Sequence, residues 1–257
     1  ENEEVLLSPV TWHSQFNQLS PYIAKIGMPI GMFYGLIWEG NYQSEDFDGN
    51  LLKSTIPTNG DNRQDIRPGD IKYRDITGDG VVNFDDYTII GNPNPKHFGG
   101  LSNNFIYKGF DLNVFFQWSY GNDILNANRY IFEGRGGVIQ NYFASYVNRW
   151  SVDNPTNEHF RVGGSGPAAY SSKVIEDGSY LRLKTVQFGY SFNPKLIKRL
   201  KIDAIRLYAS AQNLYTWTSY SGFDPEVSAR ASALTPGFDW SAYPRARTIT
   251  FGLNITL

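Results

Sequence analysis

The chain ends in an alternating pattern of apolar and polar residues. Apolar side chains occupy every second position, with small or polar residues between them: Ile249, Phe251, Leu253, Ile255 and Leu257 alternate with Thr248, Thr250, Gly252, Asn254 and Thr256. Because successive side chains of a strand point to opposite faces, this pattern predicts a strand with one apolar face. A strand that continues to the last residue is typical of outer-membrane barrels, although the edge of a soluble β-sandwich can show the same alternation.

A second alternating segment covers Phe110–Tyr120, with Phe115 as the one exception. Lys108-Gly109 precedes it, and glycine tolerates the positive φ that a two-residue hairpin turn requires. The turn predicts pairing with Gly99–Tyr107. On one face the predicted pairs are Tyr107–Phe110, Phe105–Leu112 and Leu101–Phe116, and on the other they are Asn104–Asn113 and Gly100–Gln117. The first set is apolar and the second is mostly polar, so register and turn agree.

Further strands are predicted at 180–192 and 204–215, and a Gly-rich one at 30–38. The connections then alternate between long (39–98, 121–179, 216–245) and short (108–109, 193–203). Outer-membrane barrels have long extracellular loops and short periplasmic turns. The predicted fold is therefore all-β: an antiparallel transmembrane β-barrel segment, about the last six strands of a larger barrel, with long extracellular loops. A soluble β-sandwich is the alternative.

Composition agrees with this fold. Of 257 residues, 16% are aromatic and only 19% are charged, yet no stretch reaches the ~20 apolar residues of a membrane helix. The best such stretch, Ile26–Trp38, is too short and contains Pro29. The net charge of −2 gives no reason to expect nucleic acid. Because the chain begins at Glu1 without a signal peptide, we expect it to be a piece of a longer or processed protein.

The segment from Asp75 to Asp86 fits a twelve-residue calcium loop. The predicted ligands occupy loop positions one, three, five, seven, nine and twelve: Asp75, Thr77, Asp79, the Val81 carbonyl, Asn83 and Asp86. Gly80 occupies position six, where the turn is sharpest. A hard cation takes six to eight oxygens, so a structural Ca²⁺ is predicted, with the three carboxylates converging on it. The alternative is an acidic Asx-turn loop without metal.

Signs of catalysis are weak. The three histidines are isolated, and there is no nucleophile elbow, phosphate-binding loop or dinucleotide fingerprint, so we expect no enzyme. Trp150, Tyr220 and Trp240 lie in predicted loops and are the candidates for stacking on a substrate. They could equally pack the loops together.

Five segments, in this order along the chain, resemble SusC/RagA-type TonB-dependent transporters. They are MPIGMFYGLIWEGNYQ (Met28–Gln43), Pro68–Ile124 with its PGDIKYRDITGDG start, NRWSVDNPTN (Asn148–Asn157), SYLRLKTVQFGYSF (Ser179–Phe192) and AQNLYTWTSYSGFDPEVS (Ala211–Ser228). The resemblance assigns residues 28–257 to the C-terminal part of the barrel. Residues 1–27 stay unassigned, as a possible upstream strand and connection. The last residue, Leu257, departs from the aromatic with which the family usually ends.

The resemblance implies a 22-stranded barrel in the outer membrane of a Gram-negative cell. It further implies an N-terminal plug, a TonB-contacting segment and a SusD-like surface lipoprotein as lid, of which the plug and the TonB segment are missing here. The implied function is import of oligosaccharides or oligopeptides into the periplasm, and the sequence does not distinguish these cargoes. The alternative function is that of a secreted, calcium-stabilised β-sandwich that serves in binding or adhesion.

Overall fold

The structure is a computed structural model that describes residues 4–7, 21–133, 141–164, 170–227 and 234–257. It divides into two units. The loop unit comprises Glu1–Asn94, Asp123–Glu176 and Val227–Ala242, and the sheet unit comprises Pro95–Asn122, Asp177–Glu226 and Tyr243–Leu257. Strands dominate and the helices are short, which confirms the all-β class. Within the described ranges, no helix has the length and apolar character needed to cross a membrane.

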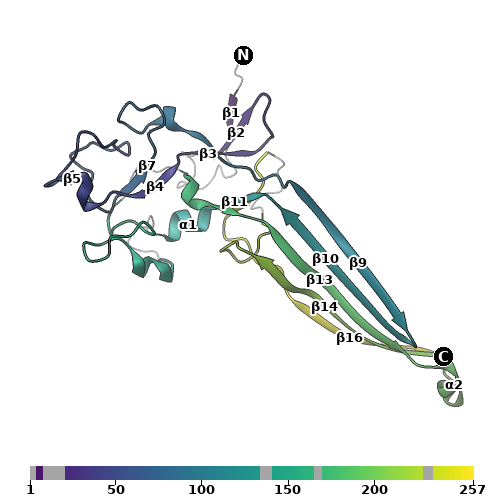
Figure 1. Cartoon of the computed structure of the whole chain (residues 1–257). Helices are drawn as coiled ribbons and strands as arrows, with labels where there is room; N and C mark the ends of the chain where they lie inside the picture. Colours follow the sequence, from purple (N-terminus) through teal and green to yellow (C-terminus); the bar gives the residue numbers. More distant parts are fainter. Residues whose placement is uncertain (1–3, 8–20, 134–140, 165–169, 228–233) are drawn as a thin grey trace. The chain divides into compact units, whose positions relative to one another are not determined.

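Five long strands form the sheet unit: β9 (His97–Tyr107), β10 (Phe110–Tyr120), β13 (Tyr180–Ser191), β14 (Ala204–Thr218) and β16 (Thr248–Thr256). They pair antiparallel in the order β16-β14-β13-β10-β9 (Figure 1). Neighbours in this sheet are neighbours in sequence, so the sheet is a meander interrupted by long insertions. The strands at 110–120, 180–192 and 204–215 were therefore predicted to within three residues at either end.

The β9–β10 hairpin has the predicted register. Tyr107 pairs with Phe110, Phe105 with Leu112, and Leu101 with Phe116. Lys108 and Gly109 both have positive φ, 46° and 89°. Two consecutive residues with positive φ give the turn a twist that matches that of the strands. The Asn104–Asn113 and Gly100–Gln117 pairs are confirmed as well.

The connections leave the sheet as predicted. Because neighbouring strands are antiparallel, the long connections before β9, after β10 and after β14 all join one end of the sheet, and the two short ones join the other. The connection from β13 to β14 holds two short helical turns, α2 (Pro194–Ile197) and η5 (Lys198–Leu200). Asn193 begins α2 by accepting a hydrogen bond from the Lys195 backbone N–H.

A bulge interrupts the sheet near the end that carries the long connections. Lys184 of β13 has no partner position on β10, so the register of that pair shifts there. On the other side of β13, two residues of β14, Asn213 and Leu214, lie opposite Lys184. Asn213 has a φ of 52°, a conformation that Asn tolerates better than most residues. The bulge inverts the alternation of β13 beyond this point while β14 keeps its own, so that Arg182 lies on the polar face with Thr216 as its partner.

The loop unit is built from short elements. Its strands are β1 (Glu4–Leu7), β2 (Tyr22–Lys25), β3 (Met32–Gly35), β4 (Trp38–Asn41), β5 (Phe47–Asp48), β6 (Leu51–Leu52), β7 (Ile71–Tyr73), β8 (Thr88–Gly91), β11 (Asp123–Asn126), β12 (Ile175–Asp177) and β15 (Phe238–Asp239). Its helical turns are η1 (Ser44–Asp46), η2 (Phe84–Asp86), α1 (Ala127–Phe132), η3 (Ala144–Asn148) and η4 (Ser172–Val174). The described parts of the long connections are therefore folded, and the described residues among 1–27 include β1 and β2.

The predicted strand at 30–38 is wrong. Gly31, with a φ of 79°, precedes β3, whose pairing with β8 shifts between Phe33 and Tyr34. The chain then forms a single bridge from Leu36 to Ser171 before β4 begins. The segment thus supplies two short strands to different sheets of the loop unit and does not join the five-stranded sheet.

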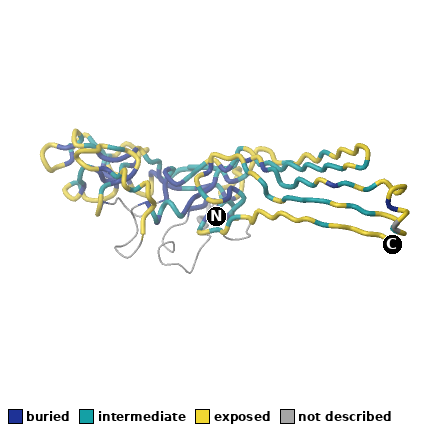
Figure 2. Tube along the Cα trace, turned by 90° about the horizontal axis from the view of Figure 1, so that it is seen from below, coloured by how far each residue is buried: buried dark blue, intermediate teal, exposed yellow. Residues whose placement is uncertain are grey.

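Burial differs between the units (Figure 2). Among the described residues of the loop unit, buried apolar side chains form three clusters, the largest of which gathers around Phe33, Leu125 and Phe238. Most residues of the long strands are exposed or half-buried. A sheet this exposed on its apolar side needs a non-aqueous environment or a partner, and its apolar face is therefore the first candidate site.

Candidate functional site

The apolar side of β16 is exposed. Ile249, Phe251, Leu253, Ile255 and Leu257 are between 51% and 87% exposed, as predicted for a face that no second sheet of the chain covers. A β-sandwich would bury these side chains, so their exposure counts against the sandwich alternative.

The apolar face continues across the sheet. Leu253 pairs with Leu207, Phe251 with Ala209, and Ala209 with Phe188. Aromatic side chains mark both of its ends. Trp118, Tyr215 and Trp217 lie toward the long connections, and Tyr107, Phe110 and Tyr190 lie toward the short ones. An apolar band with aromatic residues at both borders is the pattern of a surface that meets lipid.

The opposite face is polar. Asn113 donates a hydrogen bond to Asn104 (2.5 Å) across the β9–β10 pair. Arg206 on β14 forms an ion pair with Asp111 on β10 (2.6 Å). Glycines on this face accommodate large neighbours: a Cβ at Gly252 would collide with the Tyr208 ring, and one at Gly100 would collide with Phe115.

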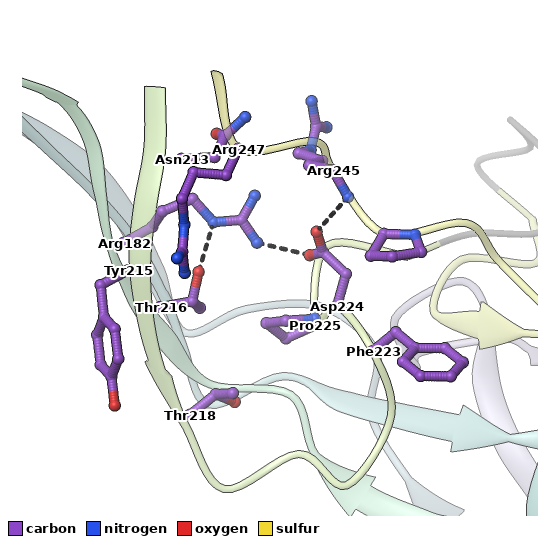
Figure 3. A pocket seen from close by; sticks show the side chains of 11 residues that line it. Arg182, Asn213, Tyr215, Thr216, Thr218, Phe223, Asp224, Pro225, Arg245 and Arg247 are labelled. Atoms are coloured by element: carbon purple, nitrogen blue, oxygen red, sulfur yellow. Dashed lines mark hydrogen bonds and ion pairs between the residues drawn. The ribbon is translucent and has the colours of Figure 1, made fainter. Parts of the chain in front are cut away.

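Arg182 is the centre of a buried ion-pair site on the sheet unit. It lies on β13 beyond the bulge and is 1% exposed. Its guanidinium donates to the Thr216 hydroxyl (3.0 Å), to Asp224 (2.5 Å) and to Glu226 (3.2 Å). These acceptors belong to β14 and to the segment that follows it, so Arg182 attaches that segment to the sheet (Figure 3).

Asp224 is buried and holds the site together. Its carboxylate accepts from the Arg182 guanidinium and from the backbone N–H groups of Glu226 (2.9 Å) and Arg245 (3.2 Å). Burial raises the pKa of Asp224. The hydrogen bonds from Glu226, Arg182 and Arg245 lower that pKa by more than burial raises it, so it lies below the ordinary value for aspartate. Asp224 is therefore ionised at neutral pH.

A cavity of about 350 Å³ adjoins this site. Its walls come from β13, β14, the segment that follows β14 and the segment that leads into β16: Arg182, Asn213, Tyr215, Thr216, Thr218, Phe223, Asp224, Pro225, Pro244, Arg245 and Arg247. Sequence reasoning missed this site. The available signal was a charged residue, Arg182, in an otherwise alternating strand, but the bulge that places it beside Thr216 has no clear sequence mark.

The predicted calcium loop folds around Asp86. One oxygen of this buried carboxylate accepts from the backbone N–H groups of Ile76 (2.7 Å) and Thr77 (3.0 Å), and the other accepts from Asn83 (2.8 Å). Asp75 accepts from the N–H groups of Gly78 and Gly80, and Asp79 from that of Val81. Nowhere in the described part of the chain do three or more Asp, Glu or His side chains gather as metal ligands. The Thr77 hydroxyl donates toward both Asp75 and Asp86 (3.2 Å each), and the convergence of these carboxylates and Asp79 on a metal ion stays a prediction.

The three aromatic candidates lie in packed surroundings. Trp150 is buried against Gly69 and donates its indole N–H to Gln43 (2.9 Å). Tyr220 is buried against Gly222, and Trp240 is half-buried against the largest apolar cluster of the loop unit. These positions favour the packing role that the sequence left open.

Comparison with solved structures of known proteins supports the fold class. No family model matches the chain. Among solved structures, the RagAB peptide importer in its open-open state superposes with a TM-score of 0.71 over 99% of this chain, at 23% identity. Another structure, of the RagAB peptide transporter, gives a TM-score of 0.70 over 98% of this chain, at 25% identity. Each match covers 24% of the larger chain.

Sequence relatives give the family. TonB-dependent receptor P3 of Formosa agariphila is 37% identical over 93% of this chain and 23% of its own length. TonB-dependent receptor SusC of Bacteroides thetaiotaomicron is 30% identical over 74% of this chain and 18% of its own length. The chain thus belongs to the SusC/RagA type of TonB-dependent receptors and spans about a fifth of the length of these relatives. The relatives are receptors and not enzymes, in agreement with the sequence prediction.

Proposed function

We propose that this chain is part of an outer-membrane importer that takes up nutrients in a TonB-dependent way. The exposed apolar face of the five-stranded sheet, with aromatic residues at both ends, carries this proposal. Such a face is unfavourable in water and favourable in lipid, where strands must close into a barrel to satisfy their backbone groups. The relatives named as TonB-dependent receptors support the same function.

The partners we propose follow from the relatives. They are a SusD-like surface lipoprotein that covers the mouth of the barrel, the TonB complex that supplies energy, and the lipid of the outer membrane of a Gram-negative cell. The cargo we propose is an oligosaccharide or an oligopeptide, and the RagAB structures, described as those of a peptide importer, support the second. We also propose a structural Ca²⁺ in the 75–86 loop, on the ligand spacing alone, and its carboxylates would then turn from backbone N–H groups toward the ion.

Gene deletion tests the import function. A strain that lacks the full-length protein should lose growth on one class of cargo, oligosaccharide or oligopeptide, when that class is the sole nutrient source. Growth on the monomeric sugar or amino acids should be unaffected. The protein should fractionate with the outer membrane and should show the heat-dependent mobility of a barrel. Unchanged growth on both classes, or recovery in the soluble fraction, would contradict the proposal.

A further inference from the structure

The cavity beside Arg182 is surrounded by more cations than carboxylates. Arg182, Arg245 and Arg247 line it together with one carboxylate, that of Asp224, and the ion pair of Lys184 with Glu226 (3.9 Å) lies beside it. Asp224 and Glu226 are the acidic side chains that these cations share within the described residues. The lining therefore carries three positive charges against one negative charge, and the Lys184–Glu226 pair beside it adds one of each sign. The site retains a net positive charge that a ligand could neutralise.

Many of the arginine donors are also unused. A guanidinium has five N–H donors and no acceptor. Arg182 directs its donors to Thr216, Asp224 and Glu226, and Arg245 pairs with Glu226 (2.9 Å). No hydrogen bond or ion pair of the exposed Arg247 side chain occurs among the residues that the structure describes. The remaining donors call for an acceptor-rich, anionic group.

The backbone that carries Arg245 and Arg247 is held in place before any ligand arrives. The backbone N–H of Arg245 donates to Asp224, and Asn213 donates from its side chain to the Ala246 carbonyl (3.0 Å). The backbone between Arg245 and Arg247 is thus fixed from both sides just before β16 begins. The Asp224 carboxylate already forms an ion pair with Arg182, so it competes only weakly with a ligand for the exposed guanidinium groups of Arg245 and Arg247. Prepositioned donors bind a ligand at lower entropic cost than mobile ones.

We propose that the cavity bounded by Arg182, Arg245 and Arg247 is a subsite for a carboxylate group of the cargo. A carboxylate matches the planar guanidinium by paired hydrogen bonds. A cavity of about 350 Å³ admits one acidic residue of a peptide or one uronic acid of a glycan, but not a whole oligomer. The exposed Phe223 ring and Pro244 supply apolar contact beside the charge. This inference rests on the proposed import function and narrows its cargo.

The test is binding of matched probes to the full-length protein purified in detergent. The probes are tetraglutamate and tetraglutamine, both amidated at the C-terminus, and trigalacturonate and galactotriose. We expect one acidic probe to bind at least about tenfold tighter than its neutral counterpart. Arg247→Gln and Arg245→Gln should each remove most of this preference and leave the neutral probe unaffected. Arg199→Gln, which removes an exposed arginine from the short turn η5, is the matched control and should keep the preference.

The outcomes are distinct. Equal affinity for acidic and neutral probes, no binding of either acidic probe, or an equal effect of Arg247→Gln and Arg199→Gln overturns the carboxylate subsite. A preference for tetraglutamate over trigalacturonate identifies peptide as the source of the carboxylate, and the reverse identifies a glycan. Because the assay needs neither TonB nor energy, it reads the subsite separately from import. Failure of the deletion test would then overturn the import function alone.

Discussion

Arg206 and Asp111 form an ion pair that spans an entire strand. They lie on β14 and β10, and β13 runs between them. The guanidinium reaches the carboxylate through two bonds, of 2.6 Å and 3.2 Å, because Gly189 lies beneath them and has no side chain. A Cβ at Gly189 would lie 2.6 Å from Arg206 Nη2 and would also collide with Asp111. The glycine is needed here for space and not for backbone freedom.

Gly189→Ala should therefore break this ion pair. We expect a loss of up to about 1 kcal/mol in barrel stability, because the atoms in the way are the ends of two side chains that can move aside, and the half-exposed pair contributes about 0.2–1 kcal/mol. The measurement is urea unfolding of the full-length protein in detergent. Asp111→Ala alone should cost about as much, and adding it to Gly189→Ala should cost little more, because the ion pair is already broken. Fully additive losses in the double variant would show that the glycine acts in another way.

The lipid-facing assignment predicts opposite effects on the two faces of β16. Leu253→Arg should impair membrane assembly, because an arginine near the bilayer midplane costs about 2–4 kcal/mol. Thr250→Arg lies three residues away on the polar face, pairs with Ser210, and should be tolerated. The heat-modifiable band on a gel measures assembly of each variant. Equal tolerance of both substitutions would argue against a lipid face.

The sequence predicted the long strands well and the loop unit poorly, for a physical reason. Period-two alternation records which face of a strand is apolar, and it fixed both ends of Phe110–Tyr120 and the register of its hairpin. The loop unit uses strands of two to four residues, too short to show a period. Its pairings also join distant segments, such as Leu125 with Phe238. The Arg182–Asp224 contact depends on a bulge and on a loop closure of 42 residues, neither of which alternation encodes.

Asp86→Asn should loosen the 75–86 loop. The Asp86 carboxylate accepts from backbone N–H groups on both oxygens, and an amide would replace one acceptor by a donor. We expect a non-specific protease to cleave this loop of the variant at lower protease concentrations than in the wild type, while the long strands stay intact. Asp85→Asn is the control, because Asp85 is exposed. Equal protease resistance of the two variants would mean that the Asp86 hydrogen bonds do not hold the loop.

The pH dependence of the same loop has a defined sign. Burial raises the pKa of Asp86, but hydrogen bonds from Thr77, Asn83 and Ile76 lower it below the ordinary value. A lowered folded-state pKa means that the ionised Asp86 carboxylate favours the folded loop. This stabilisation is fully present at pH values above the unfolded-state pKa of about 3.9. This stability should be lost as the pH falls through the lower, folded-state pKa. Hydrogen exchange of residues 76–83 between pH 5 and pH 2 measures it, and the Asp86→Asn variant should show no such dependence.

The proposed calcium site makes a separate prediction. Ca²⁺ should protect the 75–86 loop of the wild-type protein from protease, and EDTA should remove that protection. Asp79→Ala should abolish the calcium effect while sparing the loop more than Asp86→Asn, since among the described residues Asp79 accepts one hydrogen bond, from the Val81 N–H. If EDTA leaves the protease pattern of the wild type unchanged, the loop is an Asx-turn structure without metal.

Asp224→Asn should release the segment after β14 from the sheet. Arg182 is almost fully buried, and neutralising Asp224 leaves Glu226 as its carboxylate partner among the described residues, so the loss should stay below the roughly 3–5 kcal/mol of a buried charge left without any partner. Glu226→Gln should cost less, because the Glu226 side chain is more exposed than that of Asp224, with 27% against 8% of its area accessible. Hydrogen exchange of residues 219–227 measures release of the segment, and urea unfolding measures the free energy.

Since the pKa of Asp224 is lowered in the folded state, its contribution should persist at neutral pH and disappear as the pH falls below about 3.9 and through the folded pKa. Similar exchange in Asp224→Asn and Glu226→Gln would show that the segment is held by its backbone and not by Arg182.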